Sequence, residues 1–78
     1  MLRKATTFTT FCNTSREANL LSAKRALKRH RGAWIHRDTT GDDDVIDIVV
    51  GAEIMERHLC KKSHFVRYFR VEDLALYR

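Results

Sequence analysis

One run of the sequence, residues 45–50, constrains the fold more than any other part of the chain. Five of its six residues are valine or isoleucine, and β-branched side chains favour a pleated strand over a helix. A strand that is apolar at almost every position is typical of the interior of a sheet, where both faces are covered. The sequence therefore predicts a sheet with this strand near its centre, and Gly51 ends it.

Further elements flank this strand in a chain of 78 residues that has no proline and three glycines. Threonine and phenylalanine at residues 4–11 indicate one strand, and a tryptophan–isoleucine pair indicates another at 33–38. The polar stretch 39–43 predicts the turn that leads into the central strand. No repeat or linker divides the chain, so residues 1–78 are expected to form a single basic α/β binding domain.

A helix is predicted over residues 15–31, between the first two strands. Thr14 and Glu17 have the spacing of a capping box, in which each side chain bonds the backbone amide of the other residue. Gly32 is a suitable stop. The inner side of this helix is predicted to hold Leu20, Ala23, Ala26, Leu27 and His30.

The predicted helix also separates the charges of the chain. Glu17 is its only acidic residue, whereas its cations cluster toward its end. Lys24, Lys28 and Arg31 are predicted on one flank, while Arg25 and Arg29 face fully away from the inner side. The whole chain has a net charge of +5 and a pI of about 9.7. Such a positive face favours a polyanionic partner.

The second half of the chain leaves two folds open. Residues 52–62 have helical spacing, but they could also continue the central strand as a hairpin. Residues 64–71 are strand-like, and 72–78 suit a last helical turn. The helical interpretation of 52–62 predicts an α+β protein with a small ferredoxin-like βαββαβ plait. The alternative is a βαβββ sheet with one main helix. The helix would place on one face Ile54, Met55, His58 and Leu59.

An aromatic and basic row is predicted in the last strand, where Phe65, Arg67 and Phe69 share one side. Because Arg67 is costly to bury without a partner, this side would face solvent. It could then hold single-stranded nucleic acid by stacking and phosphate contacts. The alternative is that the segment with Leu74 and Tyr77 covers both phenylalanines, since burial is the commoner fate of aromatic side chains.

Metal and catalytic chemistry find little support in the spacing of the reactive residues. His58, Cys60 and His64 are close in sequence, but helix residues two apart do not face the same way. A structural zinc site also needs four well-placed ligands. Cys12 has no spacing to a histidine that marks a nucleophile and its base. We therefore expect no metal, no cofactor and no enzymatic activity, with a metal- or thiol-dependent enzyme as an alternative.

The chain shows no signal for a membrane or for export. Its apolar runs are shorter than the roughly 18 residues that span a bilayer, and its first residues lack the apolar core of a secretory signal. Two cysteines do not make a disulfide framework. A cytoplasmic protein with free thiols is expected. Because so short a chain buries only a modest core, a homodimer would add stability.

The motif LSAKRAL at 21–27, followed by GAWI at 32–35, lies between two predicted strands. Over residues 4–50 this strand–helix–strand pattern resembles small phage-encoded accessory proteins, including some anti-CRISPR inhibitors, and nothing matches beyond Gly51. The resemblance implies a stoichiometric inhibitor that occupies the nucleic-acid surface of a nuclease complex in the cytoplasm of the phage's host.

The sequence therefore predicts a small, non-catalytic basic binding protein. The favoured function is a phage-type inhibitor that engages a nucleic-acid-processing complex such as a CRISPR effector. The alternative is a module that binds nucleic acid directly. The candidate binding residues are the cations Lys24, Arg25, Lys28, Arg29, Arg31 and Arg67.

Overall fold

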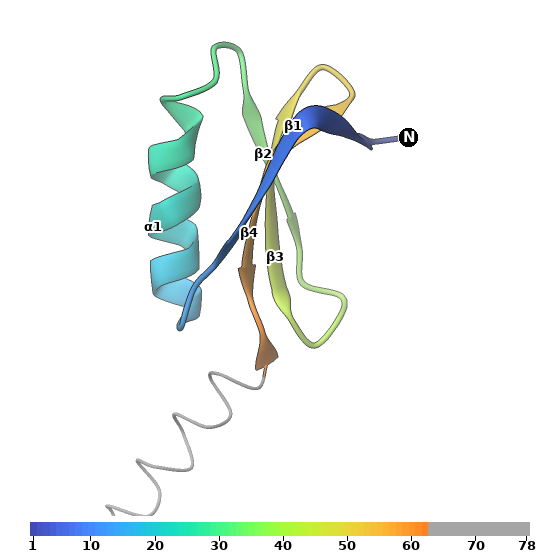
Figure 1. Cartoon of the computed structure of the whole chain (residues 1–78). Helices are drawn as coiled ribbons and strands as arrows, with labels where there is room; N and C mark the ends of the chain where they lie inside the picture. Colours follow the sequence, from blue (N-terminus) through green and yellow to red (C-terminus); the bar gives the residue numbers. More distant parts are fainter. Residues whose placement is uncertain (63–78) are drawn as a thin grey trace, which may run out of the picture.

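The computed structural model describes residues 1–62, in which one helix packs against one sheet (Figure 1). The elements are β1 Arg3–Cys12, α1 Arg16–Leu27, β2 Trp34–Asp38, β3 Asp44–Val50 and β4 Glu53–Cys60. This order, βαβββ, is the second of the two folds that the sequence leaves open. The α+β class is confirmed, and the ferredoxin-like plait with a helix over 52–62 is not what this part of the chain forms.

The sheet has four strands in the order β1-β4-β3-β2. β1 pairs parallel with β4, whereas β3 is antiparallel to both of its neighbours, β4 and β2. β3 is therefore an interior strand, as its β-branched sequence predicts. The turn from β3 into β4 contains Gly51, whose φ of +62° is a backbone conformation that glycine adopts without strain.

α1 covers one face of this sheet. The core between the two layers consists of Ala23 and Ala26 from the helix and Ile46 and Ile48 from β3, all fully buried. Alanine has a small side chain, which lets the helix approach the isoleucines of the strand closely. The residues packed around this core are Leu20, Leu27, Ala33 and Ile35. The inner side predicted for the helix is therefore confirmed for Leu20, Ala23, Ala26 and Leu27, whereas His30 lies beyond the end of α1.

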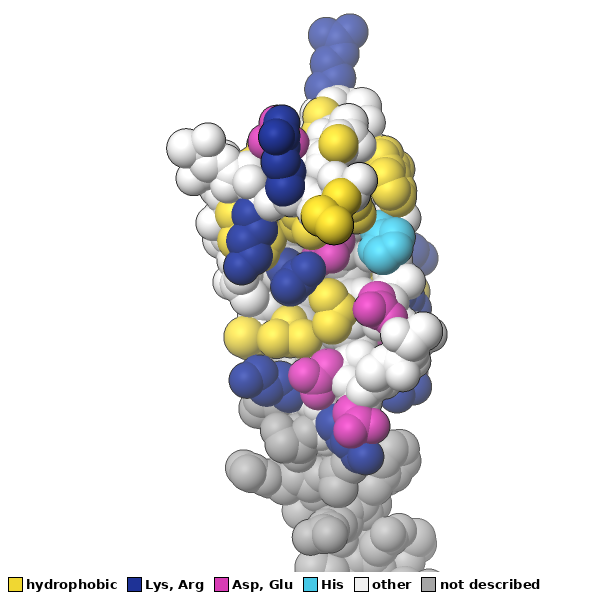
Figure 2. Space-filling view, turned by 90° about the vertical axis from the view of Figure 1, so that its right-hand side faces the viewer, with side chains coloured by type: hydrophobic (Ala, Val, Ile, Leu, Met, Phe, Trp, Pro, Cys, Tyr) yellow, Lys and Arg dark blue, Asp and Glu magenta, His cyan; other side chains and the backbone are white. Residues whose placement is uncertain are grey.

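The opposite face of the sheet is left uncovered by α1 (Figure 2). Ile46 and Ile48 point to the helix, so the alternate residues of β3 point to this second face. Cross-strand partners share a face, and the register therefore defines three rows across the sheet. These rows are Lys4–Ile54–Val49–Trp34, Thr10–Arg57–Asp47–His36 and Cys12–Leu59–Val45–Asp38.

Two details predicted for the helix are wrong. The N-cap is Ser15 and not Thr14, because the Ser15 Oγ accepts a hydrogen bond from the Ala18 amide at 3.0 Å. The helix also ends at Leu27 instead of continuing to Arg31, and turns follow. The capping-box spacing of Thr14 and Glu17 is thus present in the sequence, but the neighbouring Ser15 serves as the N-cap.

The helix predicted over residues 52–62 is also wrong, because residues 53–60 form the strand β4. The side chains of Glu56, His58 and Cys60 are buried in alternation along the strand. Met55 and Leu59, which helical spacing placed beside Ile54 and His58, are only half-buried. The predicted strand at 64–71 and the last turn at 72–78 lie outside the described residues.

Candidate functional site

The basic helix surface, as we name the exposed side chains of Lys24, Arg25, Lys28 and Arg31, is the main concentration of cations. Lys24 and Arg25 lie in the last turn of α1, Lys28 is its C-cap, and Arg31 follows in the next turn. Within residues 1–62, no acidic side chain forms an ion pair with these four residues. Four of the six candidate binding residues are therefore exposed side chains in the last turn of α1 and in the turn after it.

Arg29 does not face away from the sheet as predicted. Its Nε and one terminal nitrogen donate to the two carboxylate oxygens of Glu56 at 3.2 and 2.6 Å. The guanidinium also lies 5.5 Å from the ring centroid of Phe11. The prediction fails because α1 has already ended at Leu27, so the helical period no longer sets the direction of Arg29. The sixth candidate, Arg67, lies outside the described residues.

Each acidic side chain buried in the sheet is held by one arginine through two hydrogen bonds. Besides Glu56 with Arg29, Asp44 accepts from Arg37 at 2.8 and 2.9 Å. Asp47 accepts from Arg57 at 2.8 and 3.1 Å. Such two-pronged pairs match the planar guanidinium to the carboxylate. The sheet thus neutralises its own charges, and the excess positive charge is left on exposed residues.

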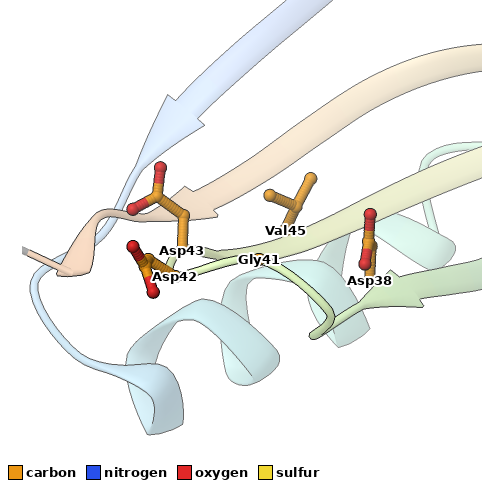
Figure 3. Close-up of a pocket in the computed structure, with 5 residues that line it drawn as sticks. All are labelled: Asp38, Gly41, Asp42, Asp43 and Val45. Atoms are coloured by element: carbon orange, nitrogen blue, oxygen red, sulfur yellow. The ribbon is translucent and has the colours of Figure 1, made fainter.

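The turn between β2 and β3 holds the exposed acids (Figure 3). It encloses a hollow of about 380 Å³ lined by Asp38, Gly41, Asp42, Asp43 and Val45. The Asp38 carboxylate accepts from the Thr40 hydroxyl at 2.6 Å and from its amide at 2.9 Å, and these bonds lower the pKa of Asp38. Figure 1 places this turn at the end of the molecule opposite the C-terminal end of α1. This turn also has a basic neighbour, since the Lys62 Nζ lies 3.4 Å from the Asp42 carboxylate.

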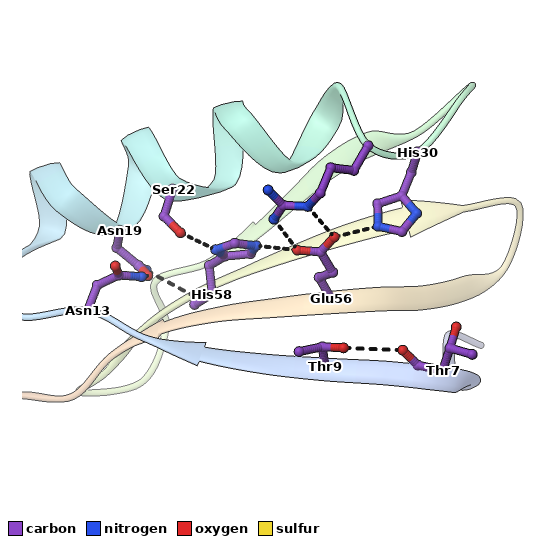
Figure 4. Close-up of polar contacts among 9 residues, drawn as sticks. Thr7, Thr9, Asn13, Asn19, Ser22, His30, Glu56 and His58 are labelled. Atoms are coloured by element: carbon purple, nitrogen blue, oxygen red, sulfur yellow. Dashed lines mark hydrogen bonds and ion pairs between the residues drawn. The ribbon is translucent and has the colours of Figure 1, made fainter.

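A polar network fills part of the space between α1 and β4 (Figure 4). The Glu56 carboxylate receives hydrogen bonds from Arg29 and also contacts His30 and the Nε2 of His58, the last at 3.0 Å. On its other side, the His58 Nδ1 lies 2.6 Å from the Ser22 Oγ. The network therefore links a serine, a histidine and a glutamate in one line.

The charges in this network fix its protonation. Burial acts to raise the pKa of Glu56, but the hydrogen bonds from Arg29, His30 and His58 outweigh it and lower the pKa to about 2. Burial lowers the pKa of His58, so its imidazole is neutral. An ionised Glu56 only accepts, so the His58 proton lies on Nε2. The His58 Nδ1 is then the acceptor, and the Ser22 hydroxyl donates to it.

Asn19 joins the N-terminal half of α1 to the two central strands. Its buried side-chain amide donates to the backbone oxygens of Asp44 and His58 at 3.1 and 3.0 Å, and to the Asp44 carboxylate at 3.1 Å. Its own oxygen accepts from Asn13 at 2.8 Å. Within the described residues, no buried side-chain nitrogen or oxygen lacks a hydrogen-bond partner. The interior polar groups are therefore fully satisfied.

Sequence reasoning missed this network. The sequence distance is one reason, since Ser22 and His58 are 36 residues apart and Arg29 and Glu56 are 27 apart. Another is that Glu56 and His58 occupy inward positions of a strand where apolar residues are expected. The alternation of two polar residues, Glu56 and His58, ahead of Cys60 was the signal that could have revealed a strand with a polar inner face.

Within residues 1–62, the two thiols and the histidines do not form a metal site. Cys12 is exposed and Cys60 buried, and both are free, with burial raising the pKa of the Cys60 thiol. In residues 1–62, no three histidine, cysteine, aspartate or glutamate side chains are grouped so that they could hold a metal ion. In the same part of the chain, no helix has the length and apolar character that crossing a bilayer requires.

Comparison of the chain with protein-family models, with curated proteins and with solved structures finds no match. The site is therefore interpreted from its own geometry.

Proposed function

We propose that this protein is a small, non-catalytic basic binding protein that engages a nucleic-acid-processing complex by contacting the nucleic acid through the basic helix surface. The observation that carries this proposal is the distribution of charge. Glu56, Asp44 and Asp47 are neutralised inside the protein by arginines. The cations of the basic helix surface have no acidic partner within residues 1–62.

Unpaired, exposed cations on one side of a helix suit the phosphate backbone of a nucleic acid. Each phosphate contact releases condensed counterions, so affinity of this kind depends strongly on salt and little on sequence. The cations of α1, from Lys24 to the C-cap Lys28, span about 6 Å at 1.5 Å per residue, and Arg31 follows in the next turn. A surface of this length can meet about two successive phosphates, which are spaced by about 3.4 Å of helix axis along each strand of duplex DNA.

The Ser22–His58–Glu56 line supports a binding function better than catalysis. A serine, a histidine and a carboxylate in sequence are the parts of an acyl-transfer site. Here His58 is fully buried, and the charge of Glu56 already faces Arg29. Burial also lowers the pKa of His58, which makes its imidazole a weaker base for the Ser22 proton. The line therefore stabilises the packing of α1 on β4.

The resemblance of residues 4–50 to phage-encoded inhibitors favours a nuclease complex such as a CRISPR effector as the target. A basic inhibitor of this kind would occupy the nucleic acid or its channel and so prevent cleavage. An affinity pull-down with and without nuclease treatment tests this part of the proposal. Capture of the complex only while nucleic acid is intact supports contact through nucleic acid. Capture of one protein that survives nuclease treatment would instead indicate a direct protein partner.

The helix assignment is tested by duplex binding at several salt concentrations. Lys24→Ala with Lys28→Ala removes two cations from the basic helix surface, and alanine keeps the helix stable. We expect weaker binding and a salt slope that falls by about 0.9 for each phosphate that the variant no longer neutralises. The matched control is Arg3→Ala with Lys61→Ala, which removes the same charge from exposed positions off the helix. Equal losses of affinity in the two variants would show only a net-charge effect and contradict the proposal.

A further inference from the structure

Two aromatic side chains stand at the outer strands of the face that α1 leaves uncovered. Trp34 in β2 is 45% exposed, and the ring of His36 meets it edge-on with 6.2 Å between centroids. Phe8 in β1 has the Lys4 Nζ 4.8 Å from its ring centroid and the Arg57 guanidinium carbon at 5.9 Å. Each aromatic ring therefore has a basic or titratable neighbour beside it.

The register of the sheet places Lys4 and Trp34 at the two ends of one row. Lys4, Ile54, Val49 and Trp34 are successive partners across the four strands. Val49 is fully buried and Ile54 nearly so, so they form an apolar floor between the outer strands. The lysine over Phe8 places this ring at the β1 end of the same line. Three strand spacings of about 4.8 Å separate the two ends by about 14 Å.

The charges of this face favour an anion at the β1 end of the row, where Lys4 lies. Asp47, in the neighbouring row, is neutralised by Arg57. Lys4 is exposed, and in residues 1–62 no acidic side chain forms an ion pair with it. The exposed acids of the β2–β3 turn lie at the far end of the strands. Figure 2 shows basic and hydrophobic side chains side by side on this face.

We propose that this aromatic row, made of Lys4, Phe8, Arg57, Trp34 and His36, is a second binding surface that holds single-stranded nucleic acid. A base stacks on the exposed ring of Trp34, while Lys4, held over the half-buried ring of Phe8 at the opposite end of the row, meets a phosphate. A separation of about 14 Å corresponds to about four nucleotides at 3.4 Å per stacked base. Duplex bases are already stacked on each other and are not offered to this surface. The inference rests on the proposed function only in assuming a nucleic-acid partner.

Intrinsic fluorescence tests this surface directly, because Trp34 is the only tryptophan of the chain. The full chain is titrated with oligothymidylate of about 12 nucleotides, a length within the range held by single-strand binding domains. We expect quenching of Trp34 by the single strand and none by a duplex of equal length. Lys4→Ala and Phe8→Leu should each weaken the single-strand affinity roughly 5- to 100-fold. Lys4 is exposed, so its variant keeps the test valid where Phe8→Leu unfolds the protein.

The basic helix surface supplies the control that separates the two proposals. Lys24→Ala with Lys28→Ala should keep the quenching by oligothymidylate while weakening the binding of the duplex. Single-strand binding without quenching, or an unchanged single-strand affinity in Lys4→Ala, would overturn the aromatic row and leave the helix assignment to the duplex measurement. Full quenching together with duplex binding that the helix variant leaves unchanged would overturn the helix assignment and support the aromatic row.

Discussion

At the scale of single residues, Glu56 is the most strongly constrained side chain of the described part. It is nearly buried, and it faces Arg29, His30 and His58 at once. Removal of the Glu56 carboxylate leaves the Nε2 of the fully buried His58 without its acceptor, and an unsatisfied buried donor is costly. The stability of the protein should therefore respond to this residue more than to the exposed charges of α1.

The network predicts a loss of stability in acid, in two steps. The pKa of His58 is lowered by burial, so below about pH 6.5 the unfolded chain binds a proton that the folded protein does not. Glu56 adds a second loss between pH 4.5 and about 2, since its carboxylate stays ionised only in the folded protein. Both steps lower the free energy of unfolding as pH falls. Thermal melts from pH 7 to pH 3 would show them.

A substitution of Glu56 tests whether this residue causes the second loss of stability. Glu56→Gln keeps the shape but removes the charge, and should destabilise by roughly 1–3 kcal/mol at pH 7. It should also flatten the melting profile below pH 4.5, where Glu56 titrates in the unfolded chain. Glu53→Gln, in the same strand and without an ion pair to any described residue, is the control and should behave like the unmodified protein. Equal profiles for the two variants would show that the network does not govern acid stability.

At the scale of elements, the sequence predicts where α1 starts, but only the structure shows which residue is its N-cap. A helix starting near residue 15 is predicted from the polar residues before an apolar pattern, and it is found. Which of Thr14 and Ser15 is the N-cap cannot be predicted, because serine and threonine are both good N-cap residues. Ser15 takes the role because its hydroxyl, and not that of Thr14, reaches the Ala18 amide.

Ser15→Ala should therefore destabilise the protein by about 1 kcal/mol, the usual effect of losing an N-cap bond. Thr14→Ala provides the control at the neighbouring position, and it should change the free energy of unfolding by less than about 0.5 kcal/mol, as is usual for exposed sites. Urea unfolding of the two variants measures the difference. A larger effect at Thr14 would mean that the predicted capping box forms after all.

The strand β4 shows why the second half of the fold was harder to predict. Ile54, Met55, His58 and Leu59 fit a helical stripe, whereas the true inward residues Glu56 and His58 are polar. Hydrophobic periodicity finds a strand only when its buried side is apolar. In β3 five of the seven residues are valine or isoleucine, so the same reasoning succeeded there. The partners that make Glu56 and His58 tolerable come from Ser22 in α1 and from Arg29 and His30 in the turn after it, far away in the sequence.

At the scale of the whole molecule, the candidate site also has a part that the sequence could predict and a part that it could not. The exposed cations Lys24, Arg25 and Lys28 could be predicted, because a helix of known phase places them toward solvent. The pairing of Arg29 with Glu56 could not be predicted, since it depends on the residue at which the helix ends. The aromatic row depends on the register of β1 and β2 with strands between them. No local pattern encodes that register.

The two layers of the fold place the basic helix surface and the aromatic row on opposite sides of the protein (Figure 1). If a duplex binds the basic helix surface and a single strand binds the aromatic row, neither ligand prevents the other from binding. We expect oligothymidylate to quench Trp34 with the same affinity in the absence and in the presence of saturating unlabelled duplex. The converse titration, a fluorescent duplex added to protein saturated with oligothymidylate, should also keep its affinity. Mutual displacement would show that one surface binds both ligands. It would then contradict the arrangement in which the sheet separates a phosphate-binding side from a base-stacking side.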